Sequence, residues 1–305
     1  MSSIEKALKK SKSESAGAKK LPANVVSDSS KPESAVSSTL ENAAAAANAK
    51  PTKNRQQARS VRFCDIDLEG LEQKGIITPG SVRSRFKEEY RLIKRPLLDR
   101  VFGEGKSRSG KPNNVIMVTS ATPGEGKTFN AISLAISIAD EQNRRVLLID
   151  ADVVNPSVAR TFGVEESDGL VDYLSGDFGD ISELLCQTNI EDLTFLQAGK
   201  RHHLTTELLA SKQMAQLVDE LSRRYPDRII ILDSPPLMHT SEAGVLASLA
   251  GQVVLVVAEN ATKQSDVKKA IARLGNRRDI GLILNKSRTT NSKYGYYYGY
   301  GEDRE

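Results

Sequence analysis

The sequence has few cysteines and lacks a long apolar run. Its two cysteines, Cys64 and Cys186, stand far apart without metal-ligand spacing, so we expect reduced thiols in a cytosolic protein. Residues 1–13 alternate charges with single apolar positions, which excludes a secretory signal. The most apolar window, residues 243–258, is interrupted by a Gly-Gln pair and falls short of the ~20 residues that span a bilayer. We therefore expect a cytoplasmic protein with no transmembrane segment of its own.

Aromatic residues are absent from residues 1–60, which are rich in Ser, Ala, Lys and Asn. Such a composition cannot bury enough apolar surface to fold, so this stretch is predicted to be a disordered leader. Within it, Ser2 and Glu5 have capping-box spacing, and residues 2–10 could form a short helix. A docking peptide that folds on a partner and a frayed terminus both fit this pattern.

Charge is distributed unevenly along the chain. Residues 1–112 carry 23 Lys and Arg against 13 Asp and Glu, whereas residues 113–305 carry 20 against 26. A basic first part suits attraction to an anionic membrane face or an acidic partner, and it also suits a plain soluble tail.

One stretch carries a nucleotide-binding signal. Residues 115–118 are apolar and β-branched, and Ala121-Thr-Pro-Gly-Glu-Gly-Lys-Thr128 then leads into a long apolar helix pattern. A loop between a strand end and a helix start points several N–H groups at one spot, where a polyphosphate can bind. Gly124 and Gly126 let the backbone curl, Lys127 can reach the outer phosphates, and the Thr128 hydroxyl can ligate Mg²⁺. The residues predicted to bind ATP are Thr122, Pro123, Gly124, Glu125, Gly126, Lys127, Thr128 and Phe129.

Strand and helix patterns alternate after this loop, which predicts an α/β fold. Near-continuously apolar runs are typical of strands buried on both faces of a parallel sheet. We therefore expect a P-loop NTPase with a doubly wound, mainly parallel sheet and helices on both faces, its ligands lying at the carboxyl ends of the strands. The further strands are predicted at 146–150, 193–197, 229–233, 253–257 and 280–284, and the clearest helix at 206–224.

Aspartates follow two of these strands. Asp150 and Asp152 end one strand, and Asp233 ends another, before Ser-Pro-Pro. Acids at strand ends beside a phosphate loop can hold Mg²⁺, directly or through water, and one can be left to accept a proton. Acids also close strands before turns without any further role.

Two regions flank the predicted nucleotide fold. We take residues 61–83 as a linker and 84–289 as the folded domain. Residues 84–100 read as a helix in which Glu88, Arg91 and Lys94 lie along one flank; this flank could contact a neighbouring subunit or form ordinary surface pairs.

The last segment, residues 290–305, is a tyrosine-rich tail without aliphatic residues. We expect it to be flexible and exposed, and its scarcity of basic residues argues against nucleic acid as a partner. The predicted phosphate acceptors are Tyr294, Tyr296, Tyr297, Tyr298 and Tyr300.

In this order and combination the motifs resemble the bacterial protein-tyrosine kinases of the cytoplasmic type, autokinases of exopolysaccharide export, and more narrowly the exosortase-associated tyrosine autokinase branch. The resemblance implies that Lys127 and Thr128 bind the nucleotide phosphates and Mg²⁺. It implies that Asp150 takes the tyrosine proton and that Asp152 and Asp233 hold the metal.

The resemblance also implies partners. Subunits of this family form rings through a Glu-x-x-Arg-x-x-Arg helix and phosphorylate each other's tails. The cytoplasmic end of a membrane polysaccharide co-polymerase usually switches them on, which would make this chain peripheral to the inner membrane. Here Lys94 replaces the last arginine of that motif, with Arg95 beside it, and Asp152 is followed by Val153-Val-Asn155 where the family commonly has arginines.

Two alternatives remain open. Partner-regulated ATPase switches of the cell-division and partition type share the fold and the strand-end acids, but they carry lysine at the position of Thr122 and lack a tyrosine tail. A nucleotide-binding scaffold without turnover would bind through Lys127 and form no phosphotyrosine.

Overall fold

The computed structural model describes residues 62–80, 85–103, 111–277 and 279–287. All of them belong to the unit that spans Gln57–Glu305. The expected leader, its short helix and the tyrosine tail lie outside the described residues. No helix among the described residues is long and apolar enough to cross a membrane.

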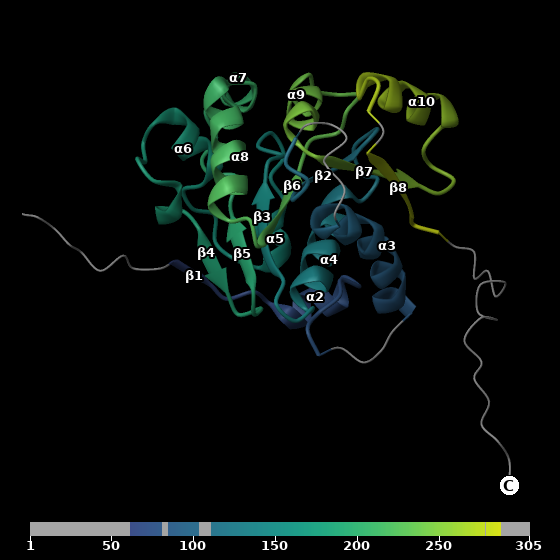
Figure 1. Cartoon of the computed structure of the whole chain (residues 1–305), viewed down its shortest axis with the longest axis horizontal. Coiled ribbons are helices and arrows are strands. Elements are labelled where there is room, and N and C mark those ends of the chain that lie inside the picture. Colours follow the sequence, from purple (N-terminus) through teal and green to yellow (C-terminus); the bar gives the residue numbers. More distant parts are fainter. Residues whose placement is uncertain (1–61, 81–84, 104–110, 278, 288–305) are drawn as a thin grey trace, which may run out of the picture. The chain divides into compact units, whose positions relative to one another are not determined.

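Eight strands form one sheet in the order β1-β4-β5-β3-β6-β2-β7-β8 (Figure 1). All neighbouring strands are parallel except β4 and β5, which run antiparallel. The mainly parallel α/β sheet predicted from the alternating patterns is therefore confirmed. The strands are β1 (Arg62–Cys64), β2 (Val115–Ser120), β3 (Arg145–Asp150), β4 (Cys186–Thr188), β5 (Leu193–Leu196), β6 (Arg228–Asp233), β7 (Gln252–Ala258) and β8 (Ile280–Asn285).

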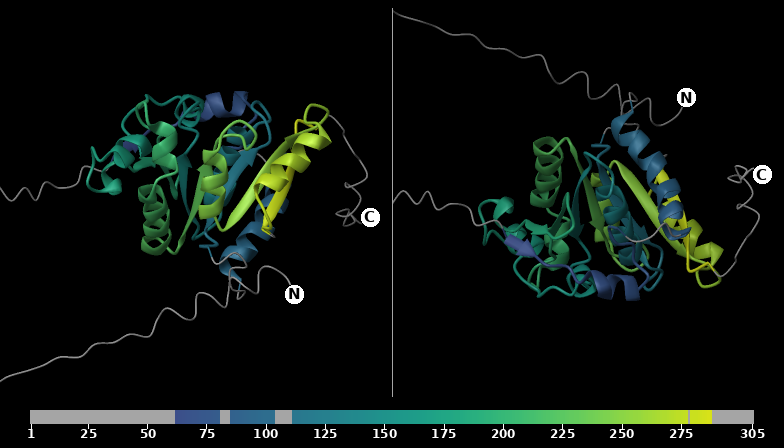
Figure 2. Two further views of the ribbon diagram at one scale, coloured as in Figure 1. Left: turned by 90° about the horizontal axis from the view of Figure 1, so that it is seen from above. Right: turned by 90° about the horizontal axis from the view of Figure 1, so that it is seen from below.

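Helices cover both faces of the sheet (Figures 1 and 2). Successive side chains of a strand point to opposite faces, so Val115 and Met117 join one core while Ile116 and Val118 join the other. The first core packs under α6 (Leu170–Ser175), α7 (Thr205–Leu209), α8 (Lys212–Arg224), α9 (Glu242–Leu249) and α10 (Gln264–Arg273). The second packs under α2 (Leu68–Gln73), α3 (Arg85–Phe102), α4 (Lys127–Ala139) and α5 (Val158–Phe162).

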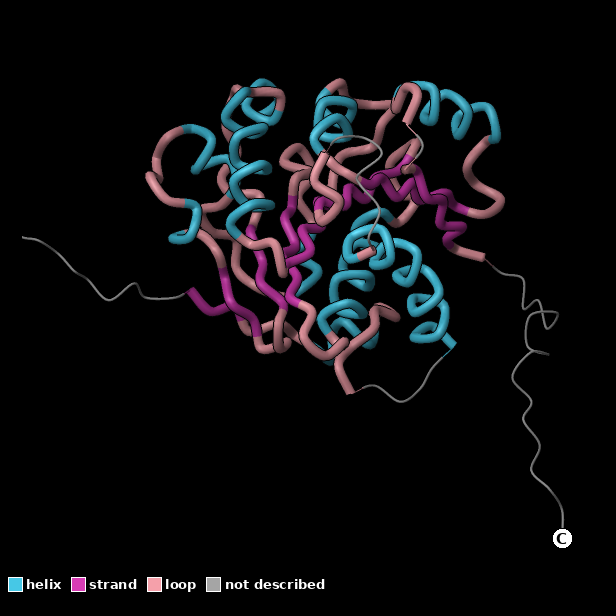
Figure 3. Tube along the Cα trace, viewed as in Figure 1, coloured by secondary structure: helices cyan, strands magenta, loops and turns pink. Residues whose placement is uncertain are grey.

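The helix expected at 206–224 is two helices, as the break in the helical tube shows (Figure 3). Ala210 and Ser211 separate α7 from α8, and the Ser211 hydroxyl accepts a hydrogen bond of 3.2 Å from the Met214 N–H. This is N-cap geometry, which begins a new helix at Lys212.

The segment expected to be a linker, residues 61–83, contributes to the folded unit. It supplies β1, which pairs with β4, and α2, and its Ile66, Leu71 and Ile76 side chains are buried in the second core. The glycines and the Thr-Pro-Gly sequence in this stretch are typical of loops. The sequence therefore did not indicate these short elements, which depend on tertiary packing.

The expectation of free thiols is wrong in this structure. Cys64 of β1 and Cys186 of β4 form a disulfide with a Cα–Cα distance of 5.9 Å, although 122 residues separate them in the sequence. The parallel register of these two strands at the sheet edge places Cys64 opposite Thr188 and Arg62 opposite Cys186, so the disulfide runs diagonally between the strands. Because this register depends on the fold of β1, cysteine spacing alone could not predict it.

Candidate functional site

A tight loop joins β2 to α4 at the carboxyl edge of the sheet. Gly124 and Gly126 adopt left-handed backbone angles, with φ of 81° and 97°. A Cβ at Gly126 would come within 2.1 Å of the Asn285 side-chain nitrogen. Only glycine allows both this φ and this close approach, so the glycine positions predicted for a phosphate-binding loop are required by its conformation.

Two of the predicted nucleotide-binding residues use their side chains to hold the loop. The buried Glu125 carboxylate accepts hydrogen bonds from the Ala121 N–H at 2.8 Å, the Thr122 hydroxyl at 2.8 Å and the Thr262 hydroxyl at 2.6 Å. Phe129 packs partly buried against the second core, and Pro123 is exposed. The Thr122 and Glu125 side chains therefore fix the loop. The backbone N–H groups of the loop, which Pro123 lacks, remain for phosphate oxygens.

Asn285, the last residue of β8, and Lys286, which follows it, support the loop from one side. The Asn285 amide donates to the Glu125 carbonyl at 2.9 Å, and the Lys286 ammonium donates to the Gly124 carbonyl at 2.7 Å. We did not identify either residue from the sequence. Their signal was their position at the carboxyl end of an apolar strand, where ligands of open α/β sheets collect.

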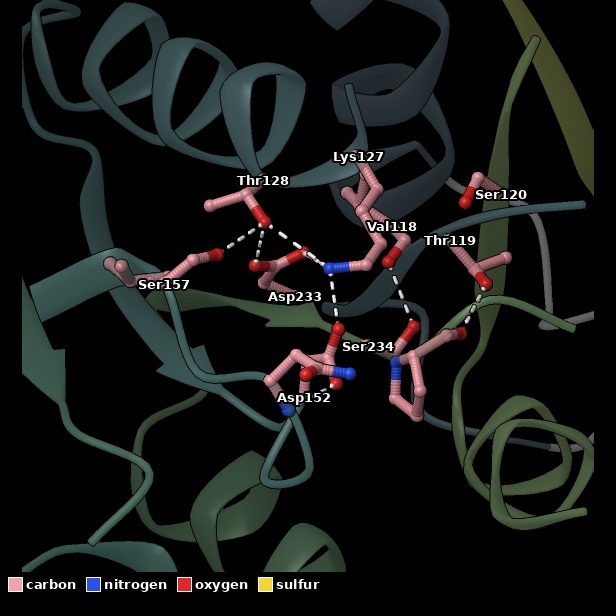
Figure 4. Close-up of polar contacts among 12 residues, drawn as sticks. Val118, Thr119, Ser120, Lys127, Thr128, Asp152, Ser157, Asp233 and Ser234 are labelled. Atoms are coloured by element: carbon pink, nitrogen blue, oxygen red, sulfur yellow. Dashed lines mark hydrogen bonds and ion pairs between the residues drawn. The ribbon is translucent and has the colours of Figure 1, made fainter. Parts of the chain in front are cut away.

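Lys127 and Thr128 lie beside the strand-end aspartates Asp152 and Asp233 (Figure 4). The Lys127 ammonium lies 2.6 Å from an Asp152 carboxylate oxygen and 3.8 Å from one of Asp233. The Thr128 hydroxyl donates to the other Asp233 oxygen at 2.6 Å and lies 2.9 Å from the Ser157 hydroxyl. Ser157, the residue before α5, was not anticipated, because no motif marks it.

Asp150 has a different environment from Asp152. One of its oxygens accepts hydrogen bonds of 3.0 Å from the backbone N–H groups of both Ser157 and Val158, at the start of α5. The other oxygen accepts a longer bond of 3.3 Å from the Asp152 N–H. Although only two residues apart, one carboxylate thus faces a helix start and the other faces Lys127.

Burial and mutual repulsion set the charges at this edge. Asp150 and Asp233 are 1% and 0% exposed. Burial, followed by the nearby Asp233 charge, raises the pKa of Asp150 to about 7, against an ordinary value of 3.8. Burial also raises the pKa of Asp233 to about 6, although Lys127 and Thr128 oppose the shift. Burial alone would lower the pKa of Lys127, but the surrounding aspartates outweigh it and the net shift is upward.

The donor set fits Mg²⁺ bound together with a polyphosphate. One Asp233 carboxylate oxygen is buried without a hydrogen-bond donor among the described residues, and the Thr128 hydroxyl lies beside the other. Across those residues no three His, Cys, Asp or Glu side chains form a self-sufficient metal cluster. Mg²⁺ usually keeps several waters and takes one or two protein oxygens together with phosphate oxygens, so Thr128, Asp152 and Asp233 could hold it only in that way.

The three residues predicted to lie along one flank of α3 are not all exposed. Glu88 and Arg91 are exposed and pair at 3.1 Å. Lys94, by contrast, is buried: its ammonium donates to the Ser137 carbonyl and lies 2.9 Å from the Glu141 carboxylate. The prediction that Lys94 lies on the same exposed flank is wrong. Lys94 is among the buried residues of α3, as are Tyr90 and Leu97, while Arg95 is exposed.

Another buried contact joins α3 to the loop. The Tyr90 hydroxyl donates to the Asn130 side-chain oxygen at 2.9 Å, and the Asn130 amide donates to the Gly126 carbonyl at 2.9 Å. A chain of two hydrogen bonds therefore connects the helix that carries Glu88 and Arg91 to the phosphate loop.

Comparison with known proteins gives concordant similarities. The profile of an AAA domain family matches residues 113–276. The tyrosine-protein kinase YwqD of Bacillus subtilis is 32% identical over 228 residues, covering 74% of this chain and 92% of the relative. The tyrosine-protein kinase CpsD of Streptococcus pneumoniae is 38% identical over 190 residues, covering 61% and 82%.

Solved structures show the same fold. The kinase domain of VpsO superposes with a TM-score of 0.56 at 28% identity, covering 66% of this chain and 96% of that domain. The kinase domain of the Escherichia coli tyrosine kinase ETK superposes with a TM-score of 0.57 at 24% identity, covering 78% and 94%. Because the identity to ETK is only 24%, that similarity shows a shared fold and nothing more.

Proposed function

The chain belongs to the bacterial tyrosine-protein kinases, and on that premise we propose that it is an autokinase whose acceptors are its own C-terminal tyrosines, phosphorylated between copies. The observation that carries the proposal is the meeting of Lys127, Thr128, Asp152 and Asp233 at one strand edge, beside a third carboxylate, Asp150, that forms no ion pair with the lysine. This arrangement separates phosphate and metal binding from proton transfer.

Each residue then has a distinct task. The loop N–H groups and Lys127 bind the ATP phosphates, and Thr128, Asp152 and Asp233 are placed to hold Mg²⁺, which neutralises charge on the phosphates when bound. Asp150 accepts the proton of the acceptor tyrosine hydroxyl while that oxygen bonds to the γ-phosphorus and ADP leaves. A pKa of about 7 suits this role, because a general base works best when its pKa lies near the operating pH.

Assembly and location belong to the same proposal. The exposed Glu88 and Arg91, with Arg95 in place of the buried Lys94, form the α3 surface that we assign to contacts within a ring. We assign the protein to exopolysaccharide synthesis or export in the cytoplasm, bound at the inner membrane to the cytoplasmic end of a polysaccharide co-polymerase. Membership of the exosortase-associated branch remains a prediction from the sequence motifs.

The test is phosphotyrosine formation by the purified full-length protein with ATP and Mg²⁺. We expect anti-phosphotyrosine signal, located by mass spectrometry to residues 294–300, and its loss in Lys127→Met. A matched control is Lys268→Met, an exposed lysine on α10. ATP hydrolysis without phosphotyrosine would favour the partner-regulated ATPase switch, and nucleotide binding without either product would favour the scaffold.

A further inference from the structure

A cavity of about 410 Å³ beside the kinase site has no role in the chemistry described above. It is lined by positions within 155–160, 166–167 and 199–201. The first of these stretches follows β3 and the last follows β5, and these two strands are neighbours in the sheet. The cavity therefore lies at the carboxyl edge, where the phosphate loop also lies.

The cavity adjoins the phosphate loop on one particular side. Its Asn155 donates a backbone hydrogen bond of 3.2 Å to the Asp152 carboxylate, and the residue after its Pro156 is Ser157, whose hydroxyl contacts Thr128. Asn285 holds the loop from the β8 side, and in the sheet order β3 and β8 lie on opposite sides of β2. The cavity thus opens next to Asp150 and Asp152, on the side away from Asn285.

Its lining is positively charged. Arg160, Lys200 and Arg201 face one acid, Glu166. The Lys200 ammonium is 2.7 Å from Asp168, whereas Arg160 and Arg201 have no ion-pair partner within the described ranges. This cluster lies in the part of the chain where acids outnumber bases, 26 to 20. Unpaired guanidinium groups in a concave site indicate an anionic ligand.

The walls are held by buried polar side chains. The Gln197 side chain donates to the Glu165 carbonyl at 3.0 Å and accepts from the Ser167 N–H at 3.0 Å. The buried Asp172 carboxylate accepts from the N–H groups of Gly169 at 2.8 Å and Lys200 at 3.1 Å. Both loops are therefore fixed against each other, so the cavity is preorganised for a ligand.

We propose that this cavity binds the acidic end of the C-terminal segment of a second copy, residues 302–305, and so positions its tyrosines at Asp150. The sequence there is Glu-Asp-Arg-Glu, which offers three carboxylates against one arginine directly after the tyrosine cluster. Tyr300 lies two residues and Tyr294 eight residues before Glu302. At roughly 3.3–3.6 Å per extended residue, the tyrosines reach about 7 to 29 Å from such an anchor. This inference rests on the proposed autokinase function and names the surface that selects its acceptor.

Two full-length chains separate enzyme from acceptor. The enzyme chain carries Phe at the five tail tyrosines and Glu302→Gln, Asp303→Asn and Glu305→Gln, so that its own tail neither reacts nor competes. The acceptor chain carries Lys127→Met. Initial rates of acceptor phosphorylation are measured against acceptor concentration. Three altered pairs are then compared with this parent pair. In the first, the enzyme carries Arg160→Glu with Arg201→Glu; in the second, the acceptor carries the same three neutralising changes at 302, 303 and 305; the third combines both.

We expect either change alone to raise the half-saturating acceptor concentration about 5- to 20-fold, with less than about a twofold loss of maximal rate. The combination should add little, because both changes remove the same interaction. Acceptors with Glu302→Lys and Asp303→Lys should recover affinity for the Glu variant enzyme. If the Glu variant unfolds, the milder enzyme variant Arg160→Gln with Arg201→Gln tests the same interaction. Lys268→Glu is the matched control.

Three results discriminate. Unchanged half-saturation, or additive losses without recovery by the lysine acceptors, would overturn this inference while leaving a working kinase. An equal loss of ATP affinity in the arginine variants would show a damaged phosphate loop and also overturn it. Failure of the parent pair to form any phosphotyrosine would overturn the proposed function itself, and this inference with it.

Discussion

Asp150 and Asp233 lie directly opposite each other in the register of β3 and β6, both buried at the carboxyl edge of the sheet. Two buried carboxylates here repel each other, and Lys127 forms an ion pair with Asp233, whereas its charge lowers the pKa of Asp150 less than burial and Asp233 raise it. Asp150 therefore has the higher pKa of the two. A bound cation or a proton would relieve the repulsion between the two carboxylates.

This relationship predicts a pH-dependent stability of the nucleotide-free protein. The folded-state pKa of Asp150, about 7, exceeds its ordinary 3.8, so the folded state binds the extra proton between these values. The contribution of this group to stability is therefore greatest below about pH 4 and is lost as the pH rises towards 7. Asp150→Asn should remove that loss. The free energy of unfolding of the variant minus that of wild type should therefore be on the order of 2 kcal/mol larger at pH 8 than at pH 4.5. Urea unfolding at the two pH values without Mg²⁺ measures it; parallel behaviour of variant and wild type would contradict it.

The two aspartates that end β3 should have separable roles. Asp152 touches Lys127, whereas Asp150 touches the backbone at the start of α5. We expect Asp152→Asn to weaken Mg²⁺-dependent nucleotide binding about tenfold or more, and Asp150→Asn to leave binding near wild type while lowering phosphoryl transfer at least about 100-fold. Calorimetric titration with a non-hydrolysable ATP analogue, set beside single-turnover rates, distinguishes them. Equal losses of affinity would remove the base assignment.

Lys127→Met tests the loop together with the stability of the site. Lys127 neutralises two carboxylates that are nearly inaccessible to solvent. Removing one partner of a buried charge pair is destabilising by about 3–5 kcal/mol, less where the carboxylates can take up protons. We expect loss of phosphotyrosine and a lowered melting temperature at pH 8 that recovers at pH 5.5. A melting temperature independent of pH would show that the ion pairs contribute little.

The disulfide ties the first strand to the folded unit. It closes a loop over a separation of 122 residues, so its loss should lower stability by about 2–5 kcal/mol. We expect Cys64→Ser to lower the melting temperature under oxidising conditions and to abolish the effect of added reductant. Kinase activity should persist, since four strands separate β1 from β2 in the sheet order. A reductant-independent melting temperature in the wild type would show that the bond does not form in solution.

The sequence predicted those parts of the molecule that have a local pattern. The five apolar runs after the phosphate loop became β3 and β5–β8, and the aspartates that end two of them meet Lys127 because parallel strands share one carboxyl edge. Residues without such a pattern were missed. Ser157 contacts Thr128 from the start of α5, and Asn285 contacts the loop from the end of β8. β1 is a strand of three residues whose formation depends on its pairing with β4. Lys94 was misplaced because helical spacing gives a flank but does not show which flank is buried.

The tail itself should act as a switch on assembly. Each phosphotyrosine adds about −1.5 to −2 charges, so several within residues 294–300 concentrate negative charge beside a kinase domain that is already acidic. Repulsion at close range, screened beyond about 8 Å at physiological salt, should then disfavour a tail held near a neighbour's active site. We expect the unphosphorylated protein to associate through its tails and the multiply phosphorylated protein to dissociate, while Phe at all five tail positions locks the associated state. Light scattering of wild type before and after addition of ATP and Mg²⁺, with the Phe variant as control, measures the change. An unchanged mass on phosphorylation would refute the switch while leaving the kinase assignment intact, because transfer requires only a transient encounter between copies.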